Sequence, residues 1–192
     1  MSRLKIYYQP IVLWAATLGL FVSYEFAQAA TLLVTPNTGV YSVNNVFTAR
    51  VVINTMGQAI NAAEGTLQFD PNQMQVVSID RSGSIFNLWV TEPTFSNAAG
   101  TITFSGGAPT GYTGAGGVIF NVTLRARAMS ESQLRFTTGA ILANDGRGTN
   151  ILTSMNGGTF PIQAVSPNPT PEQIESVAPA NTPNAPRVVS TS

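Results

Sequence analysis

The sequence predicts an all-β protein in which two antiparallel sheets pack face to face as a sandwich. Short stretches alternate apolar and polar residues with a period of two, and clusters of Gly, Pro, Asn and Asp separate these stretches. After the amino-terminal segment, no stretch shows a convincing helical period. About eight or nine short strands, recurring roughly every eight to twelve residues, are typical of such a sandwich.

The amino-terminal segment, residues 1–29, has the organisation of a secretory signal peptide. A basic start and an apolar run of 14 residues at 11–24 precede Ala27-Gln28-Ala29, a small-x-small cleavage pattern. A membrane anchor needs about 20 apolar residues, and Glu25 ends the run too early. We therefore predict cleavage near Ala29 or Ala30, a mature chain without a membrane span, and a secreted protein that is extracellular or attached to the cell surface.

The carboxyl-terminal segment, residues 165–192, differs sharply in composition from the residues before it. It holds six of the twelve prolines and no aromatic residue. A segment with so little apolar content cannot offset the entropy cost of ordering. We therefore predict a Pro/Thr/Asn-rich linker or tail over residues 165–192, which leaves residues 30–164 for the sandwich domain.

The central strand of the predicted domain is 61–69. In this stretch Ala63, Gly65, Leu67 and Phe69 alternate with polar or small residues, so one face is expected to be buried and the other solvated. The turn residues 70–72 (DPN) then predict a hairpin with the apolar stretch 74–79. The other predicted strands are 32–35, 46–54, 85–90, 94–96, 101–105, 118–128, 134–142 and 151–162.

The composition excludes several classes of function. Only 9% of the residues are charged, and nine basic residues balance nine acidic ones, so nucleic acid is not an expected partner. The absence of Cys and His removes disulfides, thiolate nucleophiles, zinc–thiolate sites and histidine bases. Nothing in the spacing of the six carboxylates in the domain selects the pair that a glycosidase needs. We predict a protein that is not an enzyme and that uses no metal or cofactor.

Two loops carry weak signals of ligand binding. Residues 144–150 (NDGRGTN) resemble half of a calcium loop, but one carboxylate is too few, and Asp-Gly is a common hairpin turn. The glycine-rich loop 106–117 lacks the lysine and the strand-to-helix context of a phosphate-binding loop. We predict a turn at the first loop and a flexible connection at the second.

Several dispersed motifs together resemble the cohesin domain. They are 60–76 (INAAEGTLQFDPNQMQV), 116–120 (GGVIF), 134–136 (LRF), 141–146 (ILANDG) and Gly157-Gly158. The resemblance covers about residues 32–162. It implies a nine-stranded jelly-roll sandwich related to carbohydrate-binding modules, and it implies a role in extracellular bacterial scaffolds, where cohesins bind dockerins on carbohydrate-active enzymes.

The same resemblance implies a recognition face built from the third, fifth, sixth and eighth strands. The position of an acidic contact residue of the family falls on Glu64, and this sequence has Ala62 where the family has an asparagine. The pattern of outward positions adds candidates that an ordinary solvated face would also explain. On the third strand these are Thr66 and Gln68, on the sixth Thr101, Thr103 and Ser105, and on the strand matched to the eighth Asn121, Thr123 and Arg125.

Three classes of function remain open from the sequence. The leading hypothesis is a cohesin-type scaffold module that binds a dockerin-like protein. A carbohydrate-binding module would instead bind polysaccharide by stacking sugars on Trp89, Phe95 and Tyr112, and it requires these rings to be exposed and co-planar. The third hypothesis is a structural surface or adhesin domain. Buried aromatic residues beside a flat polar strip would favour the protein-binding hypothesis over the sugar-binding one.

Overall fold

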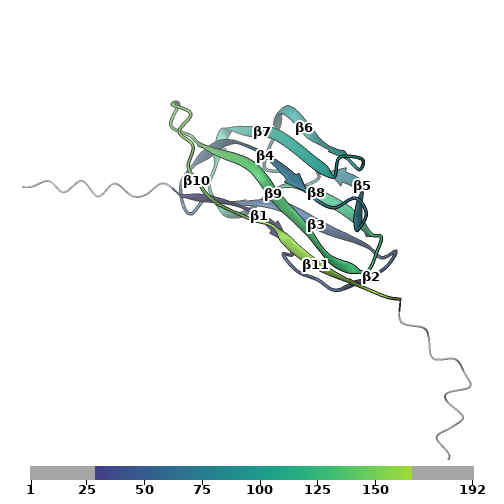
Figure 1. The fold of residues 1–192 in the computed structure, drawn as a ribbon. Helices are drawn as coiled ribbons and strands as arrows, with labels where there is room; N and C mark the ends of the chain where they lie inside the picture. Colours follow the sequence, from purple (N-terminus) through teal and green to yellow (C-terminus); the bar gives the residue numbers. More distant parts are fainter. Residues whose placement is uncertain (1–28, 166–192) are drawn as a thin grey trace, which may run out of the picture.

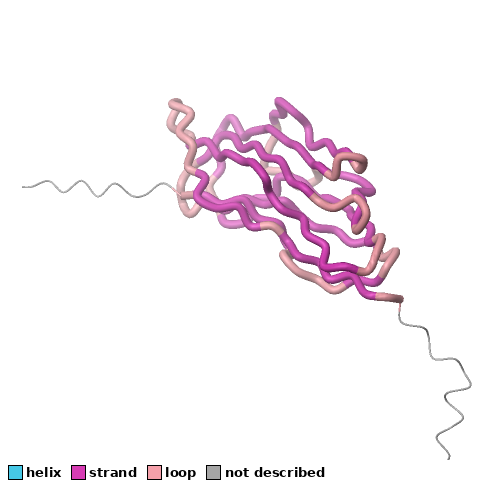
Figure 2. The backbone as a smooth tube through the Cα atoms, viewed as in Figure 1, coloured by secondary structure: helices cyan, strands magenta, loops and turns pink. Residues whose placement is uncertain are grey.

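In the computed structural model, two β-sheets lie face to face and enclose an apolar core (Figure 1). The structure describes residues 29–165, so the predicted signal peptide up to Gln28 and the predicted tail from Ser166 lie outside the described residues. Figure 2 shows only strands and loops in this part of the chain. Residues 29–165 accordingly contain no helix of the length and hydropathy that would cross a membrane.

The first sheet has five strands in the order β10-β1-β3-β8-β5. Their bounds are Leu152–Asn156 for β10, Ala30–Thr35 for β1, Val46–Asn54 for β3, Ala115–Ala126 for β8 and Met74–Asp80 for β5.

The second sheet has six strands in the order β2-β11-β9-β4-β7-β6. Neighbouring strands in both sheets are antiparallel, except that β1 pairs with β10 and β2 with β11 in parallel. The bounds are Tyr41–Ser42 for β2, Gly158–Gln163 for β11, Ser130–Ala143 for β9, Ile60–Gln68 for β4, Thr101–Tyr112 for β7 and Leu88–Ser96 for β6.

The core lies between the sheets and follows the predicted alternation. On β4 the side chains of Ala63 and Leu67 are buried, whereas Glu64 between them is exposed. The rings of Phe104 on β7 and Phe120 on β8 meet edge to face with centroids 5.3 Å apart, so an aromatic contact joins the two sheets. The predicted all-β sandwich is confirmed.

The hairpin predicted between 61–69 and 74–79 is wrong, because β4 and β5 belong to different sheets. The turn itself forms, with the backbone N–H of Asn72 donating to Asp70 Oδ1 at 2.8 Å. It carries the chain across the sandwich instead of back along the same sheet. Both strands bury one face, and a period of two does not indicate which sheet a strand joins.

Residues 29–165 form eleven strands, where about eight or nine were predicted. The predicted strands 85–90 and 94–96 are largely one strand, β6, which forms an edge and contains Pro93. The predicted strand 151–162 is divided at Gly157 into β10 and β11, which join different sheets. A Cβ atom at Gly157 would collide with the carbonyl oxygen of Leu134, so the crossing depends on glycine at this position.

Candidate functional site

The outer surface of β9, β4, β7 and β6, here called the six-stranded face, carries polar side chains in rows across the strands. The register pairs Ala140, Glu64, Ser105 and Thr91 in one row, and Thr138, Thr66, Thr103 and Thr94 in the next. A third row contains Arg135, Gln68, Thr101 and Ser96. The candidate site is therefore a hydroxyl row with a carboxylate row on one side and an arginine row on the other.

The rows differ in how well their polar groups are satisfied. Across the hydroxyl row, the Oγ1 atoms of Thr94 and Thr103 lie 3.2 Å apart. In the arginine row, Nη2 of Arg135 donates to Oε1 of Gln68 at 2.9 Å. In the carboxylate row, Ser105 Oγ donates to Glu64 Oε2 over 3.4 Å, a long and weak bond. Glu64 therefore retains most of its capacity to accept hydrogen bonds.

Within the described residues, Glu64 also has no ion-pair partner. Among residues 29–165 the ion pair between Arg81 and Glu92, 2.8 Å long, is the one that forms, and it joins β6 to the loop after β5. The carboxylate of Glu64 is thus exposed and uncompensated on a rigid strand that is paired on both sides. Such a group favours a partner that brings a cation or several hydrogen-bond donors.

Two hollows meet at Glu64. One, of about 320 Å³, lies over the hydroxyl row and includes Thr66 and Thr103 in its lining. The other, of about 240 Å³, is lined mainly by aliphatic residues from three strands, and is here called the apolar hollow. Its aliphatic members are Ala62, Ala63, Val90, Ala140 and Leu142.

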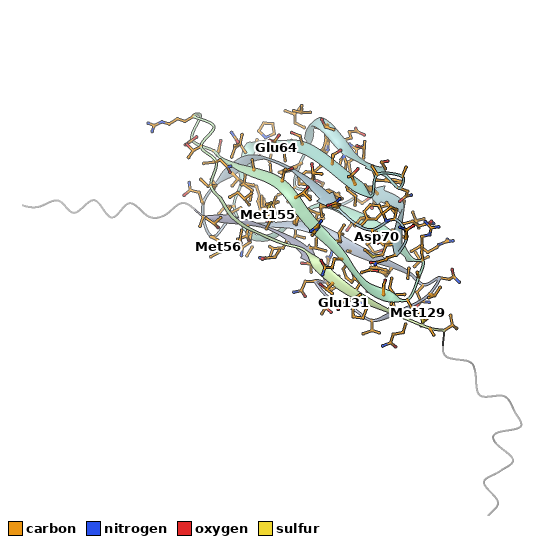
Figure 3. All side chains as sticks on the ribbon, in the orientation of Figure 1. Met56, Glu64, Asp70, Met129, Glu131 and Met155 are labelled. Carbon is orange, nitrogen blue, oxygen red and sulfur yellow. The ribbon has the colours of Figure 1, made fainter. Side chains whose placement is uncertain are left out.

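The structure brings six of the nine predicted partner-binding residues together on the six-stranded face. They are Glu64, Thr66, Gln68, Thr101, Thr103 and Ser105. The signal that found them was the alternation on β4 and β7, supported by the resemblance. Figure 3 shows Glu64 near one end of this sheet and Asp70 and Glu131 toward the other end.

The other three, Asn121, Thr123 and Arg125, lie on β8 in the five-stranded sheet, so the prediction that all nine share one face is wrong. After β7 the chain turns at residues 113 and 114 and crosses to the other sheet, and β9 rather than β8 flanks β4. Ile119, also on β8, is fully buried. The sequence interpretation missed Ala140, Thr138 and Arg135 on β9.

The residues on the opposite face are engaged in local contacts. Asn121 Nδ2 donates to the backbone oxygen of Ser82 at 3.1 Å, and the Oγ1 atoms of Thr48 and Thr123 lie 3.5 Å apart. The backbone N–H and the hydroxyl of Ser82 both donate to Asp80, which lowers the pKa of that carboxyl below its usual value. The carboxylate of Asp80 is therefore already hydrogen-bonded within the molecule.

The three aromatic residues do not form the sugar platform that the alternative required. Trp89 packs against the core, with Phe86 edge-on at 5.7 Å between ring centroids, and Tyr112 also packs against the core. Phe95 is 41% exposed on the edge strand. The three rings therefore do not meet the condition of the carbohydrate-binding alternative, because Trp89 and Tyr112 pack against the core.

The loop at 144–150 uses its carboxylate within the loop. The backbone N–H of Arg147 donates to Asp145 Oδ1 at 2.8 Å, and the Thr149 hydroxyl donates to Oδ2. These bonds lower the pKa of the Asp145 carboxyl. In the part of the chain that the structure describes, no three acidic residues cluster in a way that could hold a metal ion.

Comparisons with known proteins place this geometry in a family. The model of the Cohesin domain matches residues 31–162. No curated protein sequence matches the chain significantly.

Several solved structures share the fold at low sequence identity. A chain of a type I cohesin–dockerin complex from Clostridium thermocellum is 15% identical, with a TM-score of 0.58 over 72% of this chain and 96% of that chain. The seventh ScaB type I cohesin from Pseudobacteroides cellulosolvens is 15% identical, with a TM-score of 0.58 over 72% and 95%. A non-cellulosomal cohesin from the archaeon Archaeoglobus fulgidus is 18% identical, with a TM-score of 0.56 over 71% and 92%.

The structural similarities concern the fold, and the family assignment rests on the sequence model. That model spans more than half of the chain and nearly all of the described sandwich. This chain belongs to the cohesin domain family.

Proposed function

We propose that this chain is a non-catalytic extracellular module that docks a dockerin-type protein through its six-stranded face, within a polysaccharide-degrading or cell-surface assembly. Family membership supports this proposal, as do the solved cohesin–dockerin complexes with the same fold. One observation supports the choice of face: Glu64 is an uncompensated carboxylate between an apolar hollow and a hydroxyl row.

The arrangement suits protein recognition physically. Glu64 and Thr66 lie on β4, which is paired with β7 and β9, so their backbone is held in place before binding. A preorganised face loses little conformational entropy on association, and a few contacts at its centre then provide most of the affinity. The rest of the face excludes water around those contacts.

Export of the module is the second part of the proposal. Ala30 is fully buried at the start of β1, and its backbone N–H donates to the oxygen of Ile151 at 2.9 Å. Cleavage between Ala29 and Ala30 would leave this strand complete, whereas cleavage after Ala30 would remove a core residue. Amino-terminal sequencing of the secreted chain should read from Ala30. A chain that begins at Thr31, or that keeps its leader, would contradict this step.

We propose that residues 165–192 then act as a spacer.

The binding proposal is tested with residues 30–192 and a panel of purified dockerin modules, titrated calorimetrically. At least one dockerin should bind, and Glu64→Arg should abolish that binding, because a reversed charge is costly in a desolvated centre. Gln68→Ala, at the rim, should change the affinity by only about twofold.

Insoluble polysaccharides are tested in parallel with the same protein. If no dockerin binds and the protein is retained on a polysaccharide, the carbohydrate-binding alternative replaces the proposed function. Equal dockerin binding by the wild type and by Glu64→Arg would exclude the six-stranded face.

A further inference from the structure

The first residues of β9 have a neighbouring strand on one side only. Over residues 130–134, β9 pairs with β11. β4 pairs with β9 only from Arg135 onward, because β4 ends at Gln68 and the chain then turns at Asp70 toward the other sheet. The missing pairing leaves an opening inside the six-stranded sheet, and the two outer edges of the sheet are not involved.

A hollow of about 430 Å³ occupies this opening, at the end of the sheet away from Glu64 (Figure 3). Its wall opposite β9 is a turn held in place by Arg127, whose N–H donates to Gln73 O at 2.8 Å and whose Nη1 donates to Pro71 O at 2.6 Å. Most of the lining is polar. The polar members are three glutamines, two carboxylates and one arginine: Gln68, Gln73, Gln133, Asp70, Glu131 and Arg135.

The backbone of Gln133 points into this hollow. Gln133 lies opposite Thr159 of β11, and the N–H of Thr159 donates away from β9, to Asn37 O at 2.8 Å. The two residues are therefore a pair without mutual hydrogen bonds, and in an antiparallel ladder such a residue directs its N–H and C=O to the opposite side. The neighbouring carbonyl of Leu134 points toward Gly157 beside β11, as this alternation requires.

These two backbone groups are unpaired in the described part of the chain. β4 does not extend far enough to reach Gln133, and no turn or loop among residues 29–165 bonds to its N–H or C=O. A strand residue with both groups free is a template for a further strand. An extended peptide in the opening would exchange both hydrogen bonds with Gln133, which is the way in which sheets bind peptides by strand addition.

Two carboxylates give the opening a preference for a cation. Asp70 and Glu131 line the hollow, and neither has an ion-pair partner among residues 29–165. Arg135 lies four residues from Glu131, about 13 Å along the strand, and donates to Gln68 at 2.9 Å. The end of the opening at Glu131 therefore attracts a basic side chain and repels an acidic one.

We propose that this opening is a second binding site, in which an extended segment of a partner protein pairs with β9 at Gln133 and places a lysine or arginine opposite Glu131. The segment takes the place and the direction of β4, antiparallel to β9. Its basic residue follows the residue opposite Gln133 by two positions, because outward positions on a strand recur about every 6.8 Å. Opposite charges that face each other across two strands stabilise the pairing.

Four capped hexapeptides test the main-chain pairing and the charge preference separately. They share one sequence rich in threonine and valine, and three of them carry Lys, Gln or Glu at the position opposite Glu131. The fourth is the Lys peptide with an N-methyl group on the residue opposite Gln133, which removes the N–H of that residue. Binding to isotope-labelled residues 30–192 is followed by NMR.

The Lys peptide should bind about tenfold more tightly than either the Glu peptide or the N-methylated peptide, and the Gln peptide should be intermediate. Binding should shift the amide signals of Glu131 and Gln133. It should also slow hydrogen exchange at the N–H of Gln133, because that group gains a hydrogen-bond partner.

Two exposed carboxylates of the same sheet provide matched variants. Glu131→Lys should reverse the preference, so that the Glu peptide binds about tenfold more tightly than the Lys peptide. Glu64→Arg, the variant that should abolish dockerin binding, should leave the binding of all four peptides unchanged, since Glu64 does not line this hollow. Failure of the dockerin proposal would therefore leave this inference standing, and the reverse also holds.

Several results would overturn the inference. They are a Lys peptide that does not bind, equal binding of the Lys and Glu peptides, or undiminished binding of the N-methylated peptide. Arg187 is the one basic residue of the sequence 166–192. If Arg187→Glu shifts the Gln133 signal when no peptide is present, the chain's own segment occupies the opening instead of a partner. Shifts caused by cellohexaose and by none of the peptides would make the hollow a sugar site.

Discussion

The two outer faces of this sandwich are built from the same kind of strand, yet their polar groups are used differently. On the five-stranded sheet, Asp80 and Asn121 are both hydrogen-bonded to Ser82 in the adjoining loop. On the six-stranded face, Glu64 accepts only a long bond from Ser105 among the described residues. The carboxylate of Asp80 is satisfied within the molecule, whereas that of Glu64 keeps most of its capacity to accept hydrogen bonds.

The largest expected effect concerns the division of the strands between the two sheets. The chain crosses from β10 in one sheet to β11 in the other at Gly157. Gly157→Ala should lower the free energy of unfolding by about 3 kcal/mol, because the new methyl group meets the backbone of Leu134. Gly57→Ala is the control, since its φ of 88° is unfavourable but the space around it is open, and it should cost about 1 kcal/mol. Urea unfolding measures both values, and equal values would show that the crossing tolerates a side chain.

The sharpest test of the contrast in binding uses two threonines at matching places. Thr66 and Thr123 are both half-buried in the central row of their own face. Thr66→Arg should weaken dockerin binding about a hundredfold, because a bulky charge then stands in the centre of the interface. Thr123→Arg should leave the affinity unchanged. Calorimetric titration distinguishes the two, and the opposite result would assign recognition to the five-stranded sheet.

A smaller effect is expected where the two sheets are tied together at their edges. The Asn97 side chain accepts from the backbone N–H of Val76 at 2.8 Å and donates to its carbonyl at 2.9 Å. Asn97→Ala should cost about 2 kcal/mol of stability, because both backbone groups lose a part-buried partner. Asn121→Ala, which removes exposed bonds only, should cost less than about 1 kcal/mol. Thermal unfolding of the two variants checks the order.

The smallest effect concerns pH. The pKa of Asp80 is lowered by the N–H and hydroxyl of Ser82, so the folded state prefers the charged form. Its contribution to stability is present above the ordinary carboxyl pKa of about 4 and is lost as the pH falls through the lowered value. NMR titration should show Asp80 protonating below that ordinary value, and Asp80→Asn should remove this part of the acid dependence. A normal pKa for Asp80 would contradict the hydrogen bonds assigned to it.

The faces of the strands could be predicted from the sequence, but the sheet to which each strand belongs could not. Alternation on β4 is a local consequence of burial, so Leu67 inward and Glu64 outward follow from the pattern. The crossings from β4 to β5 and from β7 to β8 depend on long-range pairing, which leaves no period in the sequence. Asn121, Thr123 and Arg125 were therefore predicted on the same face as Glu64, but they lie on the other sheet.

The residues of the candidate site could likewise be predicted only in part. Glu64 and Thr66 were found because polar residues at alternate positions of an apolar strand are conspicuous. Ala140 and Leu142 were missed, because an apolar residue that points outward looks like a core residue in the sequence. Their position beside Ala62 becomes evident only when β9 is paired with β4.

The edge of the six-stranded sheet constrains how this protein associates. Pro93 in β6 has no backbone N–H to offer, and at the opposite edge β2 is only two residues long. Another chain therefore cannot readily extend the sheet by main-chain pairing, which would recruit extended segments regardless of their sequence and promote aggregation. The proposed association through the six-stranded face relies on side chains instead. Single substitutions there can consequently exchange one partner for another while the fold is inherited unchanged.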